Sequence, residues 1–444
     1  MDHETKSRRR PPNMSRRRFL TTTLAACSAP LILPSVRSKA AAPSRYSANE
    51  RIGIGIIGVG GRGMNHVQGF MGSDQTQVLA VCDPYQSKRL EAKRIVEDHY
   101  GRTRGAGGAY KGCEAYSDFR AILDRKDIDA VAIASPENWH ALQMALAAKA
   151  GKDIYGEKAL SLTVEEGQVV CDAVRRYGRV FQVGTQQRSD SNFRFACELA
   201  RNGYLGKIHT VKVGVPGGTS LPNAPPAPVP PGLDYEMWLG PAPYTPNNDI
   251  KCTYNWYFIR DYCVGWIQSW GVHHIDIALW GAPALGRGVL DIEGTAVFPT
   301  DGLADTSLTW RVDCFSKDTR LHFTDNSQNR QGVRFEGDRG WVHVDRGSIA
   351  AEPQSLLKVQ LRPGDERLYE SHDHQANFLE CIRTRRDPVA PVEAGHAATT
   401  LTIISDIATR VGRKVVWDWS SRSFVKGDAA NRMLRRPMRS PWTL

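Results

Sequence analysis

The sequence contains no apolar stretch that is long and uninterrupted enough to form a stable membrane-spanning helix. The best candidate precedes Pro34, and Thr, Ser and Pro residues interrupt it, whereas a spanning helix needs about 20 consecutive apolar residues. No internal repeat is visible either. The composition, with 41% hydrophobic and 24% charged residues, is ordinary for a globular protein. A chain of 444 residues is long enough for two domains and a leader.

Cysteine is too sparse to form a disulfide framework. Nine cysteines are scattered over the chain, an odd number, and several of them fall in apparent strands or helices. Proteins that are held together by disulfides are usually short and rich in cysteine. We therefore interpret the cysteines within apparent elements as buried free thiols; these are Cys82, Cys171, Cys197 and Cys381.

Excess basic charge is scarce outside the N-terminal segment. The formal net charge is +11, but residues 1–42 carry nine Lys or Arg and two Asp or Glu, so only +4 remains for the rest of the chain. A nucleic-acid-binding domain needs basic charge clustered on its folded surface. The sequence therefore predicts no nucleic-acid partner.

The N-terminal segment has the features of an export signal. Ser15-Arg16-Arg17-Arg18-Phe19-Leu20 resembles a twin-arginine motif, an apolar stretch follows, and Ala40-Ala41-Ala42 supplies the small residues of a cleavage site. We expect a signal peptide over residues 1–42, recognition by the twin-arginine export machinery, and a periplasmic or other extracytoplasmic location. A competing interpretation is a lipoprotein at Cys27, because Leu24-Ala25-Ala26-Cys27 resembles a lipoprotein cleavage box.

Residues 51–185 alternate between short apolar runs and amphipathic stretches. Apolar strands without strict alternation, separated by helices, are typical of a parallel sheet that is covered on both faces. We predict a doubly wound α/β domain with strands at 52–57, 78–81, 130–133, 153–155 and 180–183. The clearest helix opens with a capping box at Thr163 and Glu166 and stops at Gly178. Its expected apolar face consists of Val169, Val170, Ala173, Val174 and Tyr177.

Residues 186–444 follow a different pattern. A helix at 191–202 and a strand at 209–213 precede a segment, 216–246, that contains ten of the 25 prolines and is expected to be an extended surface arm. Alternating strands follow at 289–298, 307–315, 320–324 and 341–344, then helices at 375–384 and 397–411. This pattern predicts a second α/β domain with a large, mostly antiparallel open sheet. The exposed face of such a sheet often forms a dimer, so we expect a homo-oligomer.

A glycine motif follows the first predicted strand. Gly58-Val59-Gly60-Gly61-Arg62-Gly63 has the G-x-G-x-x-G spacing and precedes an amphipathic helix, so the backbone can approach a pyrophosphate at the helix N-terminus. Asp83 ends the second strand, where a carboxylate accepts hydrogen bonds from an adenosine ribose and repels a 2′-phosphate. We therefore expect a dinucleotide cofactor, with NAD favoured over NADP.

Two polar segments follow the third and fourth strands, at the edge of the sheet where open α/β sheets bind ligands. Ser135-Pro136-Glu137-Asn138-Trp139-His140 follows one strand, and Gly156-Glu157-Lys158-Ala159 follows the other. Together with the glycine motif they give the expected cofactor-binding set. Its members are Gly58, Gly60, Gly61, Arg62, Gly63, Asp83, Ser135, Pro136, Asn138, His140, Glu157, Lys158 and Gln187.

These segments resemble the glucose–fructose oxidoreductase/inositol dehydrogenase (Gfo/Idh/MocA) family. The resemblance also involves Gly184-Thr185-Gln186-Gln187-Arg188, His273-His274-Ile275-Asp276 and the closing segment 436–442, and it extends from about Arg51 to the C-terminus. It implies a nicotinamide cofactor between two domains and hydride transfer to or from a sugar, polyol or glycoside carbon. It further implies that Lys158 and His273 are catalytic. Desolvation and the positive nicotinamide ring would favour the neutral, proton-accepting form of Lys158.

A dense aromatic and charged run before His273 is a plausible wall for such a substrate, because aromatic faces pack on sugar C–H groups and Arg binds hydroxyls. For the tryptophans, core packing is the alternative. Metal binding by His273, His274 and Asp276 is a further alternative, although hydride transfer needs no metal, and we assign none. His372 and His374 are interpreted as loop residues. The expected substrate-binding set consists of Arg188, Trp256, Arg260, Asp261, Ser269, Trp270 and His274.

Two residues depart from the family pattern. Ala159 stands where the family usually has Pro, which we expect to loosen the backbone after Lys158, and Ser269 stands where many members carry Asp. Serine cannot act as a carboxylate base, so the site loses a charge. Three functions therefore remain open: an NAD-dependent sugar oxidoreductase, a redox-assisted glycosidase in which NAD is reduced and re-oxidised within one cycle, and a non-catalytic protein that binds NAD and sugar.

Overall fold

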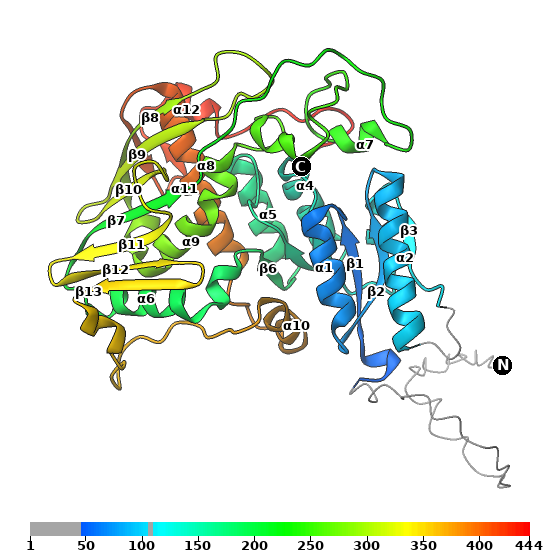
Figure 1. Ribbon diagram of the computed structural model, residues 1–444, viewed down its shortest axis with the longest axis horizontal. Coiled ribbons are helices and arrows are strands. Elements are labelled where there is room, and N and C mark those ends of the chain that lie inside the picture. Colours follow the sequence, from blue (N-terminus) through cyan, green and yellow to red (C-terminus); the bar gives the residue numbers. More distant parts are fainter. Residues whose placement is uncertain (1–45, 105–109) are drawn as a thin grey trace, which may run out of the picture. The chain divides into compact units, whose positions relative to one another are not determined.

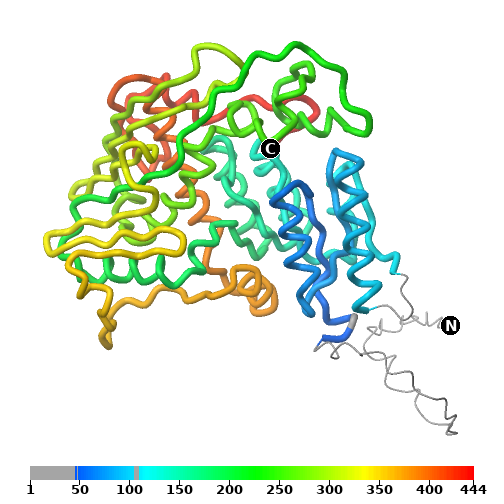
Figure 2. Tube along the Cα trace, viewed as in Figure 1, coloured from blue at the N-terminus to red at the C-terminus, as the bar shows by residue number. Residues whose placement is uncertain are grey.

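The computed structural model describes residues 46–104 and 110–444 (Figures 1 and 2). The predicted signal peptide at 1–42, including Cys27, lies outside the described residues. The described residues belong to one compact unit. Within the described ranges no helix is both long and apolar enough to cross a membrane. The eight described cysteines are free, and all except the half-buried Cys252 are buried, which confirms their interpretation as free thiols.

The first part of the described chain forms a six-stranded parallel sheet in the order β3-β2-β1-β4-β5-β6. This order confirms the predicted doubly wound domain. The five predicted strands form, and the sixth, β3, escaped prediction because it has only three partly exposed residues. The strands are β1 Ile52–Ile57, β2 Thr76–Cys82, β3 Glu114–Tyr116, β4 Ala130–Ile133, β5 Asp153–Gly156 and β6 Phe181–Val183.

Helices cover both faces of this sheet because its strands bury side chains on both sides. Ile54 and Ile56 pack with α1, α2 and α10 on one face, and Ile57 and Ile133 pack with α4 and α5 on the other. Helix α10, although it belongs to the C-terminal half of the sequence, therefore packs on the N-terminal domain (Figure 1). The helices are α1 Gly61–Gly72, α2 Gln86–Thr103, α3 Arg120–Leu123, α4 Glu137–Lys149, α5 Val164–Arg176 and α10 His374–Thr384.

Helix α5 begins where the capping pattern predicts, with a different partner for the glutamate. The Thr163 hydroxyl accepts a hydrogen bond from the Glu166 backbone N–H at 3.3 Å, whereas the Glu166 carboxylate accepts from the backbone N–H of Leu162 rather than of Thr163. The predicted apolar face is correct for Val170 and Val174, which are buried. The predicted apolar face was too wide, because Val169 and Tyr177 are 38% and 37% exposed.

The second part of the chain forms a nine-stranded sheet in the order β13-β12-β11-β7-β10-β9-β8-β14-β15. All neighbours pair antiparallel except β7 and β10, so the predicted sheet type is confirmed. Four of these strands, β11, β13, β14 and β15, were not predicted. The strands are β7 Ile208–Val215, β8 Val289–Val297, β9 Thr309–Phe315, β10 Arg320–Asp325, β11 Gly332–Gly337, β12 Gly340–Asp345, β13 Ser348–Glu352, β14 Val415–Asp418 and β15 Ser423–Phe424.

One face of this sheet carries the core, and the other face carries charged pairs such as Arg320 with Asp313 and Lys212 with Glu336. Helices α6, α9 and α11 cover the core face (Figure 1). Helix α9 is buried along its entire length. The remaining helices are α6 Ser191–Arg201, α7 Tyr235–Leu239, α8 Trp266–Ser269, α9 Gly271–Gly281, α11 Val392–Val411 and α12 Asp428–Arg432. Short 3-10 helices lie at Ala48–Glu50, Gln186–Ser189, Tyr254–Phe258, Pro283–Gly286 and Gln354–Lys358.

The proline-rich arm, residues 216–246, runs over the N-terminal domain (Figure 2). Apart from helix α7 it forms no regular element, because proline lacks the N–H that helices and central strands require. Leu233 forms an isolated antiparallel bridge with Tyr85, and the Asp234 N–H donates to the Pro84 carbonyl at 3.1 Å. Buried anchors hold the arm in place: Leu233, Tyr235, Trp238 and Leu239.

The buried His374 and the half-buried His396 are held as neutral rings. The His374 nitrogens lie 2.7 Å from the Val183 carbonyl oxygen and 2.7 Å from the Ser189 hydroxyl, so this side chain is a packed connector and not a loop residue. Burial lowers the pKa of His374 to about 4 and that of His396 to about 4. In an unfolded chain a histidine has a pKa near 6.5.

We expect stability to fall in mild acid. Below pH 6.5 the unfolded chain binds protons that the folded chain does not bind until about pH 4, so unfolding takes up protons and becomes easier as the pH falls. Each of the two histidines should lower the free energy of unfolding by about 2 kcal/mol between neutral pH and pH 5.

Urea unfolding at several pH values measures how the free energy of unfolding changes with pH. H374N should make the slope shallower, whereas H372N, at a 73% exposed side chain, should not. An unchanged slope in H374N contradicts the assignment.

Candidate active site

The glycine turn between β1 and α1 is shaped by close backbone contacts. Gly58 has φ +82°, and a Cβ on it would lie 2.6 Å from the Ser135 nitrogen; a Cβ on Gly63 would lie 1.8 Å from the Gly58 carbonyl oxygen. In contrast, a Cβ on Gly60 or Gly61 would meet no atom within 4 Å. The turn is therefore tight underneath and open above, at the N-terminus of a 12-residue helix. This shape fits a dinucleotide pyrophosphate.

Asp83 holds this turn from the end of β2. Its carboxylate accepts hydrogen bonds from the backbone N–H groups of Val59 at 3.0 Å and Tyr85 at 2.9 Å. Burial raises the pKa of Asp83, while both backbone hydrogen bonds act in the opposite direction. The residue also lines the cavity above the turn. Asp83 therefore fixes the turn and presents a carboxylate edge to a ligand.

Two adjoining cavities open at the carboxyl ends of the parallel strands. The nucleotide cavity, of about 400 Å³, lies above the glycine turn and is lined by Gly60, Asp83 and Pro136 among others. The Lys158 cavity, of about 460 Å³, lies beside it and contains Lys158 and His273. Both volumes fall within the range of ligand-binding pockets. The two cavities share five lining residues: Arg62, Ala134, Ser135, Trp256 and Tyr257.

The proline-rich arm and the segment after it form one wall of the nucleotide cavity. Met237, Trp238 and Tyr254 line it opposite the glycine turn. The indole N–H of Trp139 donates to the Met237 carbonyl at 3.0 Å. The Asn138 side-chain amide donates to the Leu239 carbonyl, also at 3.0 Å, and does not line either cavity. Asn138, expected to bind the cofactor, instead ties the arm to α4.

Glu157, at the end of β5, is the most strongly compensated charge in the site. Its Oε1 atom lies 2.7 Å from Arg62 Nε, 2.9 Å from His66 Nε2 and 3.2 Å from Gln186 Nε2. Although burial opposes ionisation, the hydrogen bond from His66 and the charge of Arg62 hold the pKa of Glu157 far below its usual range. Glu157 is therefore an anion that anchors Arg62 at the junction of the two cavities.

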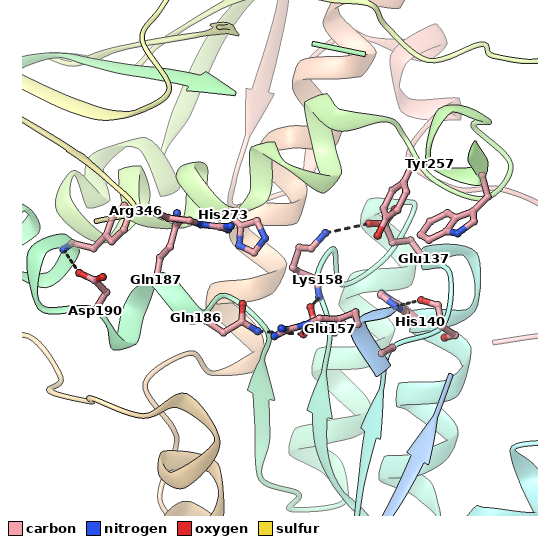
Figure 3. Close-up of a pocket in the computed structure, with 15 residues that line it drawn as sticks. Glu137, His140, Glu157, Lys158, Gln186, Gln187, Asp190, Tyr257, His273 and Arg346 are labelled. Atoms are coloured by element: carbon pink, nitrogen blue, oxygen red, sulfur yellow. Dashed lines mark hydrogen bonds and ion pairs between the residues drawn. The ribbon is translucent and has the colours of Figure 1, made fainter. Parts of the chain in front are cut away.

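Lys158 extends from the end of β5 into its cavity, between His273 and Glu137 (Figure 3). Its Nζ atom donates to the Ser269 hydroxyl at 2.7 Å and to the Ser269 carbonyl at 3.0 Å. The Glu137 Oε1 atom lies 3.8 Å away, and the centre of the Tyr257 ring lies 5.9 Å away. Residues from both domains therefore fix the position of this amine.

Ala159 is not loosely held, contrary to the expectation from the missing proline. The residue is fully buried, its N–H lies 3.4 Å from Glu137 Oε1, and its carbonyl oxygen lies 2.6 Å from His140 Nδ1. The other nitrogen of His140 lies 2.8 Å from the Ser135 carbonyl oxygen. The Lys158–Ala159 peptide bond is cis. Neighbouring side chains therefore fix the backbone after Lys158 without a proline ring.

His273 and His274 lie in the first turn of the buried helix α9, and only His273 lines the Lys158 cavity. Burial, followed by the charges of Lys158 and Arg346, lowers the pKa of His273 well below its usual value. Its Nδ1 atom has no hydrogen-bond partner within the described ranges. His274 stacks on Phe193, and burial lowers its pKa to about 3. His273 is thus a neutral imidazole with a free ring nitrogen, whereas His274 is a core residue.

Several residues of the expected substrate wall lie elsewhere. Arg188 forms a bidentate ion pair with Asp276, at 2.7 and 2.8 Å, and lines neither cavity. Arg260 and Asp261 also lie outside both linings, and Arg260 lies near Asp406 instead. Ser269 accepts a hydrogen bond from the Lys158 amine, and Trp270 packs against His273 and Arg346. Of this set only Trp256 lines the cavities.

Both carboxylate oxygens of Asp276, which was considered as a metal ligand together with His273 and His274, are engaged by Arg188. Within residues 46–104 and 110–444, no group of three or more His, Cys, Asp or Glu is arranged to hold a metal ion.

The Lys158 cavity also contains residues that sequence reasoning did not identify. Glu137 follows Pro136 at the start of α4, where an acidic residue is normally explained by the helix dipole. Arg346 comes from the turn between β12 and β13 and has no local sequence signal. The tertiary fold brings further polar residues to the cavity. Tyr257 belongs to the predicted aromatic and charged run, and the unpredicted lining residues are Ala134, Glu137, Gln186, Asp190, Phe193 and Arg346.

Comparison with protein families gives a consistent assignment for both domains. Residues 52–185 match the oxidoreductase family described as the NAD-binding Rossmann fold, and residues 212–444 match its C-terminal alpha/beta domain. An uncharacterized oxidoreductase of Bacillus subtilis, YrbE, is 32% identical over 357 residues, which cover 76% of this chain and 88% of that protein. The chain belongs to the Gfo/Idh/MocA oxidoreductase family.

Further proteins are similar to this chain over part of its length or in fold. An alpha-N-acetylgalactosaminidase of Shewanella oneidensis is 32% identical over 210 residues, 44% of each protein. The WlbA dehydrogenase of Chromobacterium violaceum, solved with NADH and UDP-GlcNAcA, shares the fold with a TM-score of 0.61 at 16% identity, covering 83% of this chain and 97% of that one. The aldose-aldose oxidoreductase of Caulobacter crescentus, complexed with glycerol, has a TM-score of 0.58 at 18% identity, covering 82% and 99%.

The two kinds of glycine in the turn should respond differently to alanine. G63A places a Cβ against the Gly58 carbonyl, so we expect a lower melting temperature and loss of dinucleotide binding. G60A adds a methyl group that meets no protein atom, so the melting temperature should remain and affinity should fall. Calorimetric titration with NAD and thermal unfolding separate the two effects. Unchanged affinity in G60A would contradict a pyrophosphate at this turn.

Proposed function

We propose that this protein is an NAD-dependent oxidoreductase that acts on a hydroxyl group of a sugar, polyol or glycoside. One observation carries the proposal. The side chains of Lys158 and His273 line one cavity, which shares Arg62, Ser135 and Tyr257 with the nucleotide cavity. A site for proton exchange therefore adjoins the site that fits a dinucleotide. A nicotinamide cofactor, when bound, accepts or returns the hydride of the substrate carbon.

In this proposal Lys158 and His273 handle the substrate hydroxyl. Lys158 Nζ exchanges a proton with the reacting oxygen, and Ser269 holds the amine in place through two hydrogen bonds. The neutral His273 ring offers a nitrogen that either donates to or accepts from the same hydroxyl. Trp256 and Tyr257 stack on each other with ring centres 3.8 Å apart and form an aromatic wall at the junction of the cavities. Such a wall suits the C–H face of a sugar.

The cofactor preference proposed is NAD over NADP. The buried Asp83 carboxylate lies at the rim of the nucleotide cavity, at the end of β2, where an adenosine ribose is bound in such folds. A 2′-phosphate would meet like charge there. Lys88 also lines the cavity, so a phosphate would not lack a cation, and the proposal depends on the carboxylate being the nearer group to the ribose.

The arm supports the proposal that the cofactor is held tightly. Its hydrogen bonds to Trp139 and Asn138 and its bridge to Tyr85 close the nucleotide cavity from the opposite domain. Release of a dinucleotide would require this wall to open, which slows dissociation. Tight retention of the cofactor suits an exported enzyme, because free NAD is scarce outside the cytoplasm. It also requires that NADH be re-oxidised while it stays bound.

Export and self-association are part of the same proposal. The arginine motif at 15–20 and the small residues at 40–42 support export by the twin-arginine machinery to an extracytoplasmic location, with a lipoprotein at Cys27 as the competing processing route. The open face of the nine-stranded sheet carries the exposed residues Val289, Val297 and Phe315 besides its charges. These support a homo-oligomer formed through that face.

A redox-assisted glycosidase is the second candidate. The match to an alpha-N-acetylgalactosaminidase and to several members of glycosyl hydrolase family 109 supports it. In that reaction the cofactor is reduced and re-oxidised within one cycle, which agrees with a cofactor that does not leave. The chain spans less than half of the length of those glycosidase relatives, so the oxidoreductase assignment stays first.

K158M should abolish most activity. It removes the amine and keeps the length of the side chain, so kcat should fall by about 10²- to 10⁴-fold, the usual contribution of general acid–base catalysis. Because Lys158 does not line the nucleotide cavity, NAD affinity should change little. K149M, on the exposed end of α4, is the matched control and should keep wild-type kinetics. A K158M variant with undiminished kcat would remove Lys158 from the mechanism.

The balance of NADH separates the two candidate reactions. Protein purified without added cofactor should release NAD(H) on denaturation, because the arm closes its cavity. Incubation with sugars and aryl glycosides, followed by absorbance of NADH and by product analysis, then distinguishes the outcomes. A dehydrogenase accumulates bound NADH with an oxidised sugar, whereas a glycosidase releases the aglycone without net reduction. Protein that is free of nucleotide and has no measurable affinity for NAD contradicts both.

A further inference from the structure

Glu137 is a buried carboxylate whose charge the proposed mechanism does not use. It is the first residue of α4, only 1% of it is exposed, and it lines the Lys158 cavity. Its Oε1 atom lies 3.8 Å from Lys158 Nζ, and its Oε2 atom has no hydrogen-bond partner among the described residues. An ionised carboxylate out of contact with water is costly unless a cation compensates it. Lys158 is the cation with which it forms an ion pair.

Glu157 also interacts with Lys158 through its charge, but Glu137 is the carboxylate within ion-pair distance of the amine. Ser269 offers a hydroxyl and a carbonyl oxygen, both neutral. Glu157 precedes Lys158, but Arg62, His66 and Gln186 already engage its Oε1 atom. Glu137 is thus the carboxylate that remains for the amine.

The remaining groups around the pair either are neutral or carry positive charge. The thiol of Cys263 lies against Glu137, and burial together with that carboxylate raises the Cys263 pKa well above its usual value. Burial, followed by the charge of Glu137, likewise raises the pKa of Tyr257 above its usual range. The other titratable or charged groups facing the pair are Tyr254, His140, His273, Arg346 and Arg62.

We propose that Glu137 is the positioning carboxylate of Lys158: it supplies from α4 the negative charge that Ser269 cannot supply from α8, and it holds the amine in the ammonium form over the cavity. The inference rests on the role proposed for Lys158. Glu137 compensates for the serine at position 269, because it provides a carboxylate from a different element. Glu137 also faces the N–H of Ala159 at 3.4 Å, so a purely structural role is the alternative that the experiment must exclude.

The direct test measures how readily Lys158 loses its proton in the holoenzyme. A small amine-reactive reagent is applied over a pH series, and mass spectrometry quantifies the modified peptide that contains Lys158. In E137Q the midpoint of this reaction should move to lower pH by about one to three units, the effect of removing a unit charge at this separation. The pH midpoint of turnover should move in the same direction.

E97Q is the matched control. Glu97 is 7% exposed, and one of its oxygens, also without a hydrogen-bond partner among the described residues, lies 3.9 Å from a lysine on α2, away from both cavities. This variant should lower thermal stability as E137Q does and leave the Lys158 midpoint unchanged. A shift of the same size in E97Q would mean that loss of a buried glutamate acts through stability, which overturns the proposal.

A carboxylate returned at position 269 should restore the midpoint. The Ser269 hydroxyl lies 2.7 Å from Lys158 Nζ, so S269D in the E137Q background places a negative charge beside the same amine. Return toward the wild-type midpoint supports a charge role, because a structural defect at position 137 would not be repaired from α8. An unchanged midpoint in E137Q, or no recovery in the double variant, overturns the proposal.

Failure of this inference is separable from failure of the proposed function. The labelling midpoint needs no substrate, so it reports on Glu137 even if K158M leaves turnover unaffected. Should E137Q not fold, E137D retains the charge at a greater distance, and S269D alone adds a second one. The midpoint should then move slightly to lower pH in E137D and to higher pH in S269D. If the midpoint moves in neither variant, the proposal is contradicted.

Discussion

Two carboxylates buried at the ends of adjacent strands set the charge balance of this site. Glu137 lies after β4 and Glu157 directly follows β5, and each is less than 5% exposed. A buried anion needs a cation or several donors. Glu157 obtains Arg62, His66 and Gln186, and Glu137 obtains Lys158. These pairings place the Arg62 guanidinium at the junction of the two cavities and the Lys158 amine in one of them, which is the arrangement that the chemistry proposed here requires.

The second constraint is that both domains complete each cavity. The glycine turn and Asp83 belong to the parallel sheet, whereas Trp238 and Tyr254 close the nucleotide cavity from the arm and the segment after it. His273, from α9, lines the Lys158 cavity, and Ser269, from α8, accepts a hydrogen bond from the Lys158 amine. A ligand in either cavity therefore contacts both domains, so binding and domain packing are coupled.

Local patterns in the sequence predicted what depends on local chemistry. The strand–turn–helix around Gly58 and Gly63, the parallel order of the first sheet and the mostly antiparallel second sheet all follow from spacing and hydrophobic pattern. Partners that are distant in sequence did not follow. Arg188 was expected at the substrate but is neutralised by Asp276, and Arg346 enters the cavity from a strand turn without any motif. Three-residue β3 and two-residue β15 are too short for periodicity to detect.

A structure of the holoenzyme with NAD(H) and a hydroxylated ligand tests the central claim most directly. The account predicts a dinucleotide extended from Asp83 over Gly60 and Gly61, beneath the arm, with its nicotinamide ring at the junction formed by Arg62, Ser135 and Tyr257. A ligand hydroxyl should lie within hydrogen-bond distance of both Lys158 Nζ and His273. A dinucleotide bound elsewhere, or a Lys158 amine directed into bulk solvent in that complex, would contradict it.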